Sequence, residues 1–318
     1  MTTVKIGTHS GTFHADEVLA CAMLRILFKD PVIVRSRDSD ILATCDYVVD
    51  VGGEYNHAAK RYDHHQRGFE ETFNSKYFTK LSSAGLVFKH YGKEIIKKSL
   101  QTNESNTDIL YQKVYTSFIE AFDGVDNGVD RFSTSDIPKY KDNTNISSII
   151  GSMNGTHVEP EDLQDERFLK AVNWIGPIFE RILVVYGKSW LPAREIVLNS
   201  LLKMKDGVFA LQEYVPWKSH VYELEEDLLK SKKISQKPLF CVYPTKDTWR
   251  VTCVSVTETS FENRLSLPEK WRGLRDEELD AASGIPGGTF VHAAGFTGGN
   301  KTKEGLFKML DYTIKKMK

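Results

Sequence analysis

The chain has 318 residues, which is enough for two domains of ordinary size. Its 42 basic and 43 acidic residues give a formal net charge of −1, and this balance argues against the strongly basic surface that binding to duplex DNA usually requires. Hydrophobic residues make up 41% of the chain, and no apolar run reaches the roughly 18 residues that a membrane span needs.

Strand-like and helix-like segments alternate in the first part of the chain. Val4–Thr8, Val32–Val34 and Tyr47–Val51 are short apolar runs typical of buried strands. Apolar residues recur at helical spacing from Val18 to Leu27, ahead of Pro31. This order predicts an α/β domain in which a mostly parallel sheet is flanked by helices. Because such sheets bind ligands at the carboxyl ends of their strands, polar residues that follow a strand are candidates for a site.

A domain boundary is predicted near Gly187. A long helix is expected from about Asp162 to Tyr186, and it would connect a first domain of residues 1–187 to the rest of the chain. The second domain, residues 188–318, is expected to be a smaller α/β domain. Its sequence has two strand-like runs, a glycine-rich segment and a final helical pattern from Lys303 to Lys316.

Four polar segments contain the residue types that suggest chemistry. Thr8–Glu17 is a loop between a strand and a helix with two imidazoles and a carboxylate, and Asp50 directly follows a strand. The other two segments are the Asp-His-His triplet that begins at Asp63 and the polar stretch Phe122–Gly128. Taken singly, the segments other than the Asp-His-His triplet are better explained as polar turns or helix starts. Together they offer as metal ligands His9, His14, Asp16, Asp50, His64, Asp123 and Asp126.

A mixed set of imidazoles and carboxylates suits Mn²⁺ and tolerates Mg²⁺ or Zn²⁺. Two such ions about 3.5–4 Å apart can clamp the attacking and leaving oxygens of a phosphoryl transfer. A carboxylate that bridges the two ions holds them close despite their repulsion, and Asp50 is the predicted bridge. The residues therefore predict a phosphoesterase with two divalent metal ions.

The four segments resemble the ordered motifs of the DHH phosphoesterase superfamily, and more closely those of the Myg exonuclease family (melanocyte-proliferating-gene type). The resemblance covers essentially the whole chain, and it includes Trp271–Arg275 and the glycine-rich segment Ser283–Phe296. The latter is similar to the Gly-Gly-His-x-x-Ala-Ala-Gly substrate motif of DHH nucleases. The resemblance implies a DHH-type catalytic domain in residues 1–187, which includes the connecting helix, and a substrate-binding domain in residues 188–318.

The resemblance also implies roles for individual residues. His65 would contact the scissile phosphate, and with Asp50 it forms the expected catalytic pair. His14 departs from the superfamily pattern, which has an aspartate there, and one extra residue separates it from His9. The implied ligands are His9, His14 and Asp50 for one ion, and Asp16, Asp50, His64 and Asp123 for the other, with Asp126 as the alternative to Asp123.

Candidate substrate contacts lie in both predicted domains. Ser82 and Ser83 precede a helical pattern, where exposed N–H groups bind phosphate, although plain helix capping explains them somewhat better. Arg35 and Arg37 share a face after a strand and reach either phosphate or solvent. Glycines allow a nucleotide to approach the backbone closely. The candidates are Arg35, Arg37, Ser82, Ser83, Arg275, Gly288, His292, Gly295 and Lys301.

The Myg resemblance implies a 3′-to-5′ exonuclease that acts on single-stranded RNA or short oligonucleotides and releases nucleoside monophosphates. Two other functions stay open at this point. One is a phosphoesterase for a small substrate such as pyrophosphate, a cyclic dinucleotide or a nucleoside bisphosphate. The other is a metal-binding interaction module without catalysis, which the imidazole of His14 favours. An open cleft lined by aromatic side chains would favour RNA over a small substrate.

The chain is expected to be intracellular and to have no membrane partner. Its N-terminal segment has no signal-peptide core. Its four widely separated cysteines predict buried, reduced thiols. The resemblance adds the nucleus, the cytoplasm or the mitochondrion as the compartment.

Overall fold

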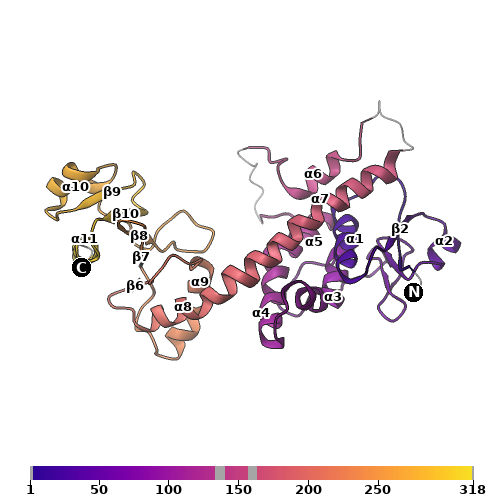
Figure 1. Cartoon of the computed structure of the whole chain (residues 1–318), viewed down its shortest axis with the longest axis horizontal. Coiled ribbons are helices and arrows are strands. Elements are labelled where there is room, and N and C mark those ends of the chain that lie inside the picture. The colour runs from indigo at the N-terminus through magenta and orange to yellow at the C-terminus, as the bar shows by residue number, and fades with distance from the viewer. Residues whose placement is uncertain (1–2, 133–139, 157–162, 317–318) are drawn as a thin grey trace. The chain divides into compact units, whose positions relative to one another are not determined.

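The computed structural model describes residues 3–132, 140–156 and 163–316. The chain divides into two compact units, unit 1 from Met1 to Gly187 and unit 2 from Lys188 to Lys318 (Figure 1). Each unit contains a five-stranded sheet and several helices, so the predicted α/β fold class is confirmed. The catalytic and substrate-binding roles that the sequence assigns to the two units stay predictions. None of the described helices combines the length and the apolar character that a membrane-spanning helix needs.

The sheet of unit 1 is mostly parallel. Its strand order is β2-β1-β3-β5-β4, and only β4 runs antiparallel to its neighbour, at the edge. Parallel strands end at the same edge of a sheet, so the residues that follow β1, β3 and β5 converge there. The strands are β1 Lys5–Thr8, β2 Val32–Arg35, β3 Tyr47–Val49, β4 Tyr55–Asn56 and β5 Arg61–Tyr62.

Helix α1 (Ala15–Leu27) is the central helix of unit 1. Its residues from Ala15 to Leu24 are all buried, because it packs against both α3 and α7 (Figure 1). The predicted long helix is present as α7, which contains Pro177; Asp162, its expected start, lies outside the described residues. The other helices are α2 Ser39–Ala43, α3 Ser83–Leu100, α4 Glu104–Val114, α5 Glu120–Asp126, α6 Ile146–Ser152 and α7 Gln164–Val185.

A π-helical turn, η1 (Tyr115–Ile119), joins α4 to α5 without a break. Tyr115 at its start donates a hydrogen bond of 2.9 Å from its hydroxyl to Oδ2 of Asp123 in α5. The two residues are eight positions apart, whereas two turns of an α-helix take only about 7.2 residues. The wider π turn takes up the extra residue and keeps both side chains on one face.

Unit 2 is built on a sheet with the order β6-β7-β8-β10-β9, in which only β6 and β7 are parallel. The strands are β6 Val208–Ala210, β7 Phe240–Pro244, β8 Trp249–Cys253, β9 Gly288–Val291 and β10 Thr297–Asn300. The helices are η3 Tyr186–Trp190, which begins before the boundary, α8 Leu191–Leu202, α9 Lys218–Lys230, η4 Glu269–Trp271, α10 Asp276–Ser283 and α11 Lys303–Lys315.

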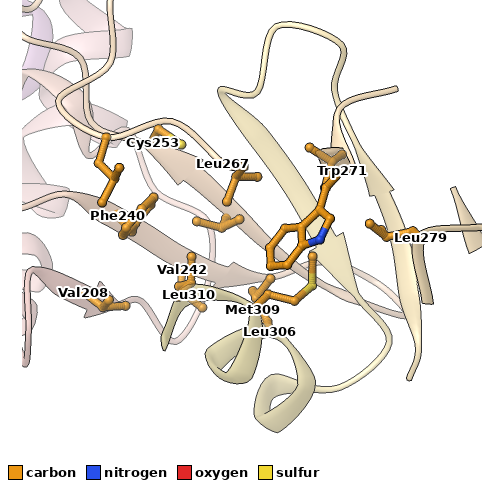
Figure 2. Packing of buried hydrophobic residues seen from close by; sticks show 13 residues of the cluster. Val208, Phe240, Val242, Cys253, Leu267, Trp271, Leu279, Leu306, Met309 and Leu310 are labelled. Atoms are coloured by element: carbon orange, nitrogen blue, oxygen red, sulfur yellow. The ribbon is translucent and has the colours of Figure 1, made fainter. Parts of the chain in front are cut away.

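Two apolar clusters form the core of unit 2. In one, the fully buried indole of Trp271 lies near Met309 of α11 (Figure 2). The other joins α8 and α9 to Phe209 and Cys241. Because side chains alternate along a strand, the sheet uses one face for each cluster. All four cysteines of the chain are unpaired and buried, as predicted.

Candidate metal centre

Three strand ends of unit 1 bring imidazoles and carboxylates together. His9 follows β1, Asp50 follows β3, and the Asp-His-His triplet follows β5. The first turn of α1 and the last residue of α5 add further carboxylates. Among the residues that the structure describes, potential ligand atoms within 4.8 Å of one another form three groups. They are His9, His14, Glu17 and Asp50; Asp50, His64 and His65; and His14, Asp16 and Asp126.

Asp50 is at the centre of this arrangement. Its Oδ2 lies 3.4 Å from Nε2 of His9, and its Oδ1 lies 3.3 Å from Nε2 of His64. The hydroxyl of Ser83 donates to Oδ1 at 3.2 Å. The backbone of Asp50 is left-handed, with φ of +57°, a conformation that aspartate and asparagine adopt more readily than most residues. This turn directs the carboxylate between the two imidazoles.

The two imidazoles beside Asp50 are held by carboxylates on both sides. Burial alone would lower the pKa of His9, but contacts with Asp50 and Glu17 outweigh burial and raise it to about 10. Burial likewise opposes protonation of His64, whose pKa the carboxylates of Asp126 and Asp50 raise to about 10. Burial raises the pKa of Asp50, yet these same imidazoles outweigh burial and hold it below its usual range. These contacts favour the protonated form of both imidazoles, and a metal ion that binds their ring nitrogens must displace a proton.

Two buried carboxylates of α1 each have an oxygen without a hydrogen-bond partner among the described residues. Asp16 is buried, and its Oδ1 has no hydrogen-bond partner among the described residues. Burial raises the pKa of Asp16 well above its usual value, and repulsion from Asp50, Glu17 and Asp126 adds to the effect. The second oxygen of Glu17, Oε2, also lacks a partner in the described structure. Buried carboxylate oxygens without partners are unfavourable unless a cation satisfies them, so this donor set fits divalent metal ions.

Glu17 was not among the predicted ligands. It is fully buried, and its Oε1 lies 3.0 Å from Nε2 of His9 and accepts a hydrogen bond of 2.8 Å from the backbone of His14. The sequence signal was its position three residues after His14, which is the spacing of a capping box. Because that spacing already accounts for Glu17 as a helix cap, the sequence gives no reason to predict its contact with His9.

Asp63 is a second residue that sequence analysis did not assign a role. Its Oδ1 accepts hydrogen bonds from the backbone of His64 and His65, and it lies 2.7 Å from Nδ1 of the His65 imidazole. Its Oδ2 accepts a bond from the backbone of Gly53. The side chain of His65 is 63% exposed although Asp63 is buried. Asp63 thus fixes the orientation of an imidazole that faces solvent.

The structure separates the two aspartates that the fourth segment offered. Oδ1 of Asp123 accepts hydrogen bonds from the backbone and the hydroxyl of Ser82, and Oδ2 accepts one from Tyr115. Asp123 belongs to none of the three ligand groups. Oδ2 of Asp126, in contrast, lies 3.0 Å from Nε2 of His64. The geometry favours Asp126 as the fourth-segment ligand and gives Asp123 a structural role.

Ser82 and Ser83 are buried, contrary to the expectation that they face a substrate. Besides its bond to Asp50, the hydroxyl of Ser83 donates to the backbone carbonyl of Tyr62, and its N–H donates to Oδ2 of Asp16. Ser82 is bound to Asp123, as described above. Both serines lie at the start of α3, and their hydrogen bonds hold the carboxylates of Asp16, Asp50 and Asp123 in place.

Arg35 and Arg37 have different surroundings. The guanidinium of Arg35 packs 4.6 Å from the ring centroid of Phe168 and donates to Asp165 and to the carbonyl of Gly11. Its side chain is only 2% exposed, because α7 covers it. Arg37 lies at the site, with Nη2 3.3 Å from Nδ1 of His9. Arg37 is therefore the better candidate for a phosphate contact.

Arg35→Gln is expected to lower the free energy of unfolding by about 1–3 kcal/mol, because charged hydrogen bonds and packing against α7 are lost together. The number of bound metal ions should not change. Urea denaturation checks the first expectation, and metal analysis of the purified variant checks the second. Arg25→Gln is the matched control, since this exposed residue bonds only the side chain of Asn173 among the contacts described. Unchanged stability with a loss of RNA binding would instead assign Arg35 to the substrate.

The predicted substrate residues of unit 2 lie around β9 and the turn that follows it. Arg275, His292 and Lys301 are exposed. Gly295 has φ of +70°, and a Cβ there would lie 2.5 Å from Nε of Arg272. Gly288 is buried, and a Cβ on it would collide with Leu279 of α10. Packing within unit 2 thus explains both glycines without a nucleotide.

Comparisons with known proteins agree over nearly the whole chain. A family model called MYG1_exonuc, with the description "Uncharacterised protein family (UPF0160)", matches residues 5–314. The MYG1 protein of Dictyostelium discoideum is 47% identical over 99% of this chain and 97% of its own length. The MYG1 exonuclease of Homo sapiens is 43% identical over 99% of this chain and 86% of its own length.

One solved structure is a distant match, the crystal structure of RecJ in complex with Mn²⁺ from Thermus thermophilus. It has a TM-score of 0.23 and 14% sequence identity, and the match covers 98% of this chain and 52% of RecJ. The chain therefore spans about half the length of that protein.

Proposed function

The chain belongs to the MYG1 exonuclease family (UPF0160), and on this premise we propose that it is a metal-dependent phosphodiesterase that removes nucleotides from the end of a nucleic acid. The finer proposal is a 3′-to-5′ exonuclease that acts on single-stranded RNA and releases nucleoside monophosphates. One observation supports the metal-dependent phosphodiesterase: groups of ligand atoms overlap at Asp50 and at His14, as a site for two adjacent ions requires.

Two divalent ions are proposed, Mn²⁺ in the first place, with Mg²⁺ as the alternative. When bound, they supply positive charge that neutralises the phosphate and makes water more acidic at neutral pH. The proposed ligands are His9, His14 and Asp50 for one ion, and Asp16, Asp50, His64 and Asp126 for the other. Glu17 is proposed to support His9 and His14, which it already contacts.

The chain's own groups place the phosphate and its protons. Asp63 binds the His65 imidazole at Nδ1, which leaves Nε2 free to donate a hydrogen bond to a phosphate oxygen or a proton to the leaving group. Arg37 beside His9 offers a fixed positive charge for a second phosphate oxygen. The formal net charge of −1 suits a protein that grips a few phosphates near a chain end rather than a long duplex.

The test is an assay of the purified full chain with Mn²⁺ on single-stranded RNA labelled at its 3′ or 5′ end. The 5′-labelled strand should shorten stepwise from its 3′ end, and the 3′-labelled strand should release its label as a mononucleotide at once. His65→Ala should lower the rate by about 100-fold or more, as expected for the loss of an acid–base group. DNA of the same sequence and duplex RNA are the comparison substrates.

Two other outcomes would each replace the proposal. Metal-dependent turnover of pyrophosphate or a cyclic dinucleotide, without cleavage of RNA, would identify a small-substrate phosphoesterase. Tight binding of metal without turnover of any phosphoester would identify a non-catalytic module, as the imidazole at His14 first suggested.

A further inference from the structure

A row of side chains crosses the sheet of unit 2 from strand to strand. Arg250 of β8 lies opposite Gly299 of β10, and Gly299 lies opposite Phe290 of β9. Beyond the sheet edge, Arg275 forms an isolated bridge with Phe290. Residues directly opposite one another project from the same face of a sheet. An aromatic ring therefore lies in one row with two arginines and a glycine.

Both arginines are close to the aromatic ring. The guanidinium carbon of Arg250 lies 5.2 Å from the ring centroid of Phe290, and that of Arg275 lies 5.7 Å from it. Gly299 lies between Arg250 and Phe290 and has no side chain, so Arg250 can reach across β10 to the ring. A Cβ at Gly299 would lie 2.5 Å from Oγ1 of Thr289 and 3.5 Å from Cε1 of Phe290. The glycine thus allows β9 side chains to pack closely over β10.

Neither core cluster of unit 2 contains Phe290. Its neighbour Val291 points into the cluster of Trp271, so Phe290 faces the opposite side of the sheet. Phe290 is half-buried, while Arg250 and Arg275 are exposed. Within the described part of the chain, neither arginine has a carboxylate at ion-pair distance. An exposed cation–π contact contributes only about 0.5–1 kcal/mol, so surface packing alone gives little reason for two unpaired charges here.

The row continues to a second aromatic residue. Tyr243 of β7 lies opposite Arg250, and its ring packs edge-on against Tyr214, which is exposed. Tyr243 also borders a hollow of about 400 Å³, to which Trp217 and Lys218 contribute. Tyr243 and Phe290 are separated by three strand spacings, or about 14 Å, so the two rings can contact different bases of one strand.

We propose that the row formed by Tyr243, Arg250, Gly299, Phe290 and Arg275 is a platform on which unpaired bases of a single-stranded nucleic acid stack. Aromatic rings and guanidinium planes stack on bases of any sequence, and the charges of the two arginines attract the phosphates between the bases. The bases of a duplex are already stacked on one another, so only unpaired bases can use this surface. The inference rests on the proposed function for its choice of a nucleic-acid chain as the ligand, and it adds the base as the feature recognised.

The test measures binding without turnover. The full chain is titrated, in EDTA and at low salt, against a fluorescein-labelled octamer of adenylate RNA and against an octamer of the same length with abasic positions. Phe290→Ala is expected to weaken binding of the adenylate octamer by about 5- to 150-fold, the effect of losing one stacked base. Its affinity for the abasic octamer should match that of the wild type, because the phosphate contacts are intact.

Two control variants separate stacking from general effects of mutation. Phe290→Tyr keeps the ring and should retain the affinity of the wild type. Phe261→Ala removes a ring that is fully exposed in another segment of unit 2, and it should leave binding of both octamers unchanged. Thermal melting shows whether Phe290→Ala folds. If it does not fold, Arg250→Gln replaces it, with weaker binding of both octamers as the expected result.

Three results would overturn the inference. They are equal binding of the adenylate octamer by Phe290→Ala and the wild type, equal losses of affinity for both octamers in Phe290→Ala, and no binding of either octamer by the wild type. For Arg250→Gln, unchanged binding of both octamers would overturn it. The outcome is independent of hydrolysis. Base-dependent binding through Phe290 in a protein that does not cleave RNA would remove the proposed function but keep the platform. Cleavage of RNA by a protein whose RNA affinity does not depend on Phe290 would keep the proposed function but remove the platform.

Discussion

Asp50→Asn should lower metal-dependent hydrolysis by about 1,000-fold or more while the protein stays folded, because Asp50 contacts the imidazoles of both proposed ion sites. Asparagine tolerates the left-handed backbone at this position and has nearly the same volume, so the fold is preserved. Its amide cannot supply the negative charge that bridges two cations. Single-turnover rates measure the loss, and calorimetric titration with Mn²⁺ counts the ions that remain.

Asp46→Asn is the matched control for this substitution. Asp46 precedes β3, and its carboxylate accepts a hydrogen bond from the backbone of Lys5 at the other end of the strands. Full activity is expected in that variant. Asp50→Ala is a poorer probe because alanine strains the backbone at φ of +57°. Hydrolysis by Asp50→Asn within about tenfold of the wild type would show that the ions do not need this carboxylate.

The second large effect is expected for substitution of Asp126, and it distinguishes the role of this residue from that of Asp123. Asp126→Asn is expected to remove the ion that Asp16, Asp50, His64 and Asp126 are proposed to hold, and to slow hydrolysis by about 100-fold or more, because the carboxylate lies beside His64. Asp123→Asn should retain both ions and hydrolyse at close to the wild-type rate. Metal analysis and single-turnover rates on the two variants decide between them. The reverse pattern would make Asp123 the ligand.

Asp123→Asn should also change how stability depends on pH. Burial raises the pKa of Asp123 to about 7, even though hydrogen bonds from Ser82 and Tyr115 lower it. A carboxyl group whose pKa is higher in the folded state loses stabilising free energy as pH rises from the unfolded value, near 4, to the folded value. The stability of the wild type relative to Asp123→Asn should therefore fall between pH 4 and pH 7, at a slope of up to about 1.4 kcal/mol per pH unit. Urea denaturation across this range measures it, and parallel curves would contradict the assignment.

The sequence allowed the prediction of those parts of the site that depend on strand ends. Apolar runs before His9 and Asp50 predict that both follow parallel strands, and such strands end at one edge. The structure places them there, with Oδ2 of Asp50 3.4 Å from His9. The α/β fold followed from the same pattern. The sequence pattern of each strand was sufficient to place His9 and Asp50, because the pairing of parallel strands alone fixes where their ends lie.

Contacts between segments that are far apart in the chain could not be predicted from the sequence. Arg35 lies at a strand end, which predicts contact with a substrate or with solvent, but α7, more than 100 residues later, supplies Phe168 to cover it. Ser82 and Asp123 each looked like a local cap or turn, whereas they bond to each other across 41 residues. Periodicity predicts that a helix has a buried face but not which neighbour covers it.

The choice between Asp123 and Asp126 shows the same limit within one helix. The two residues are three positions apart in α5, so both lie on nearly the same side of it. Which of them reaches His64 depends on the rotation of α5 about its axis. The turn Tyr115–Ile119 sets that rotation, and no feature of sequence periodicity revealed its π-helical form.

A π turn is equivalent to an α-helix with one inserted residue. Because the wider turn absorbs that residue, the helix that follows keeps its orientation. If these five residues formed a regular α-helix with no residue removed, α5 would be turned by about 100° relative to α4. Asp123 would then leave Ser82, and Asp126 would leave His64, although every ligand was still encoded. Deletion of one residue within the turn would instead remove the bulge and place Asp123 seven positions after Tyr115, which is still the same face of an α-helix. Substitutions that make this stretch a regular α-helix without shortening it are therefore the changes that would misplace both aspartates.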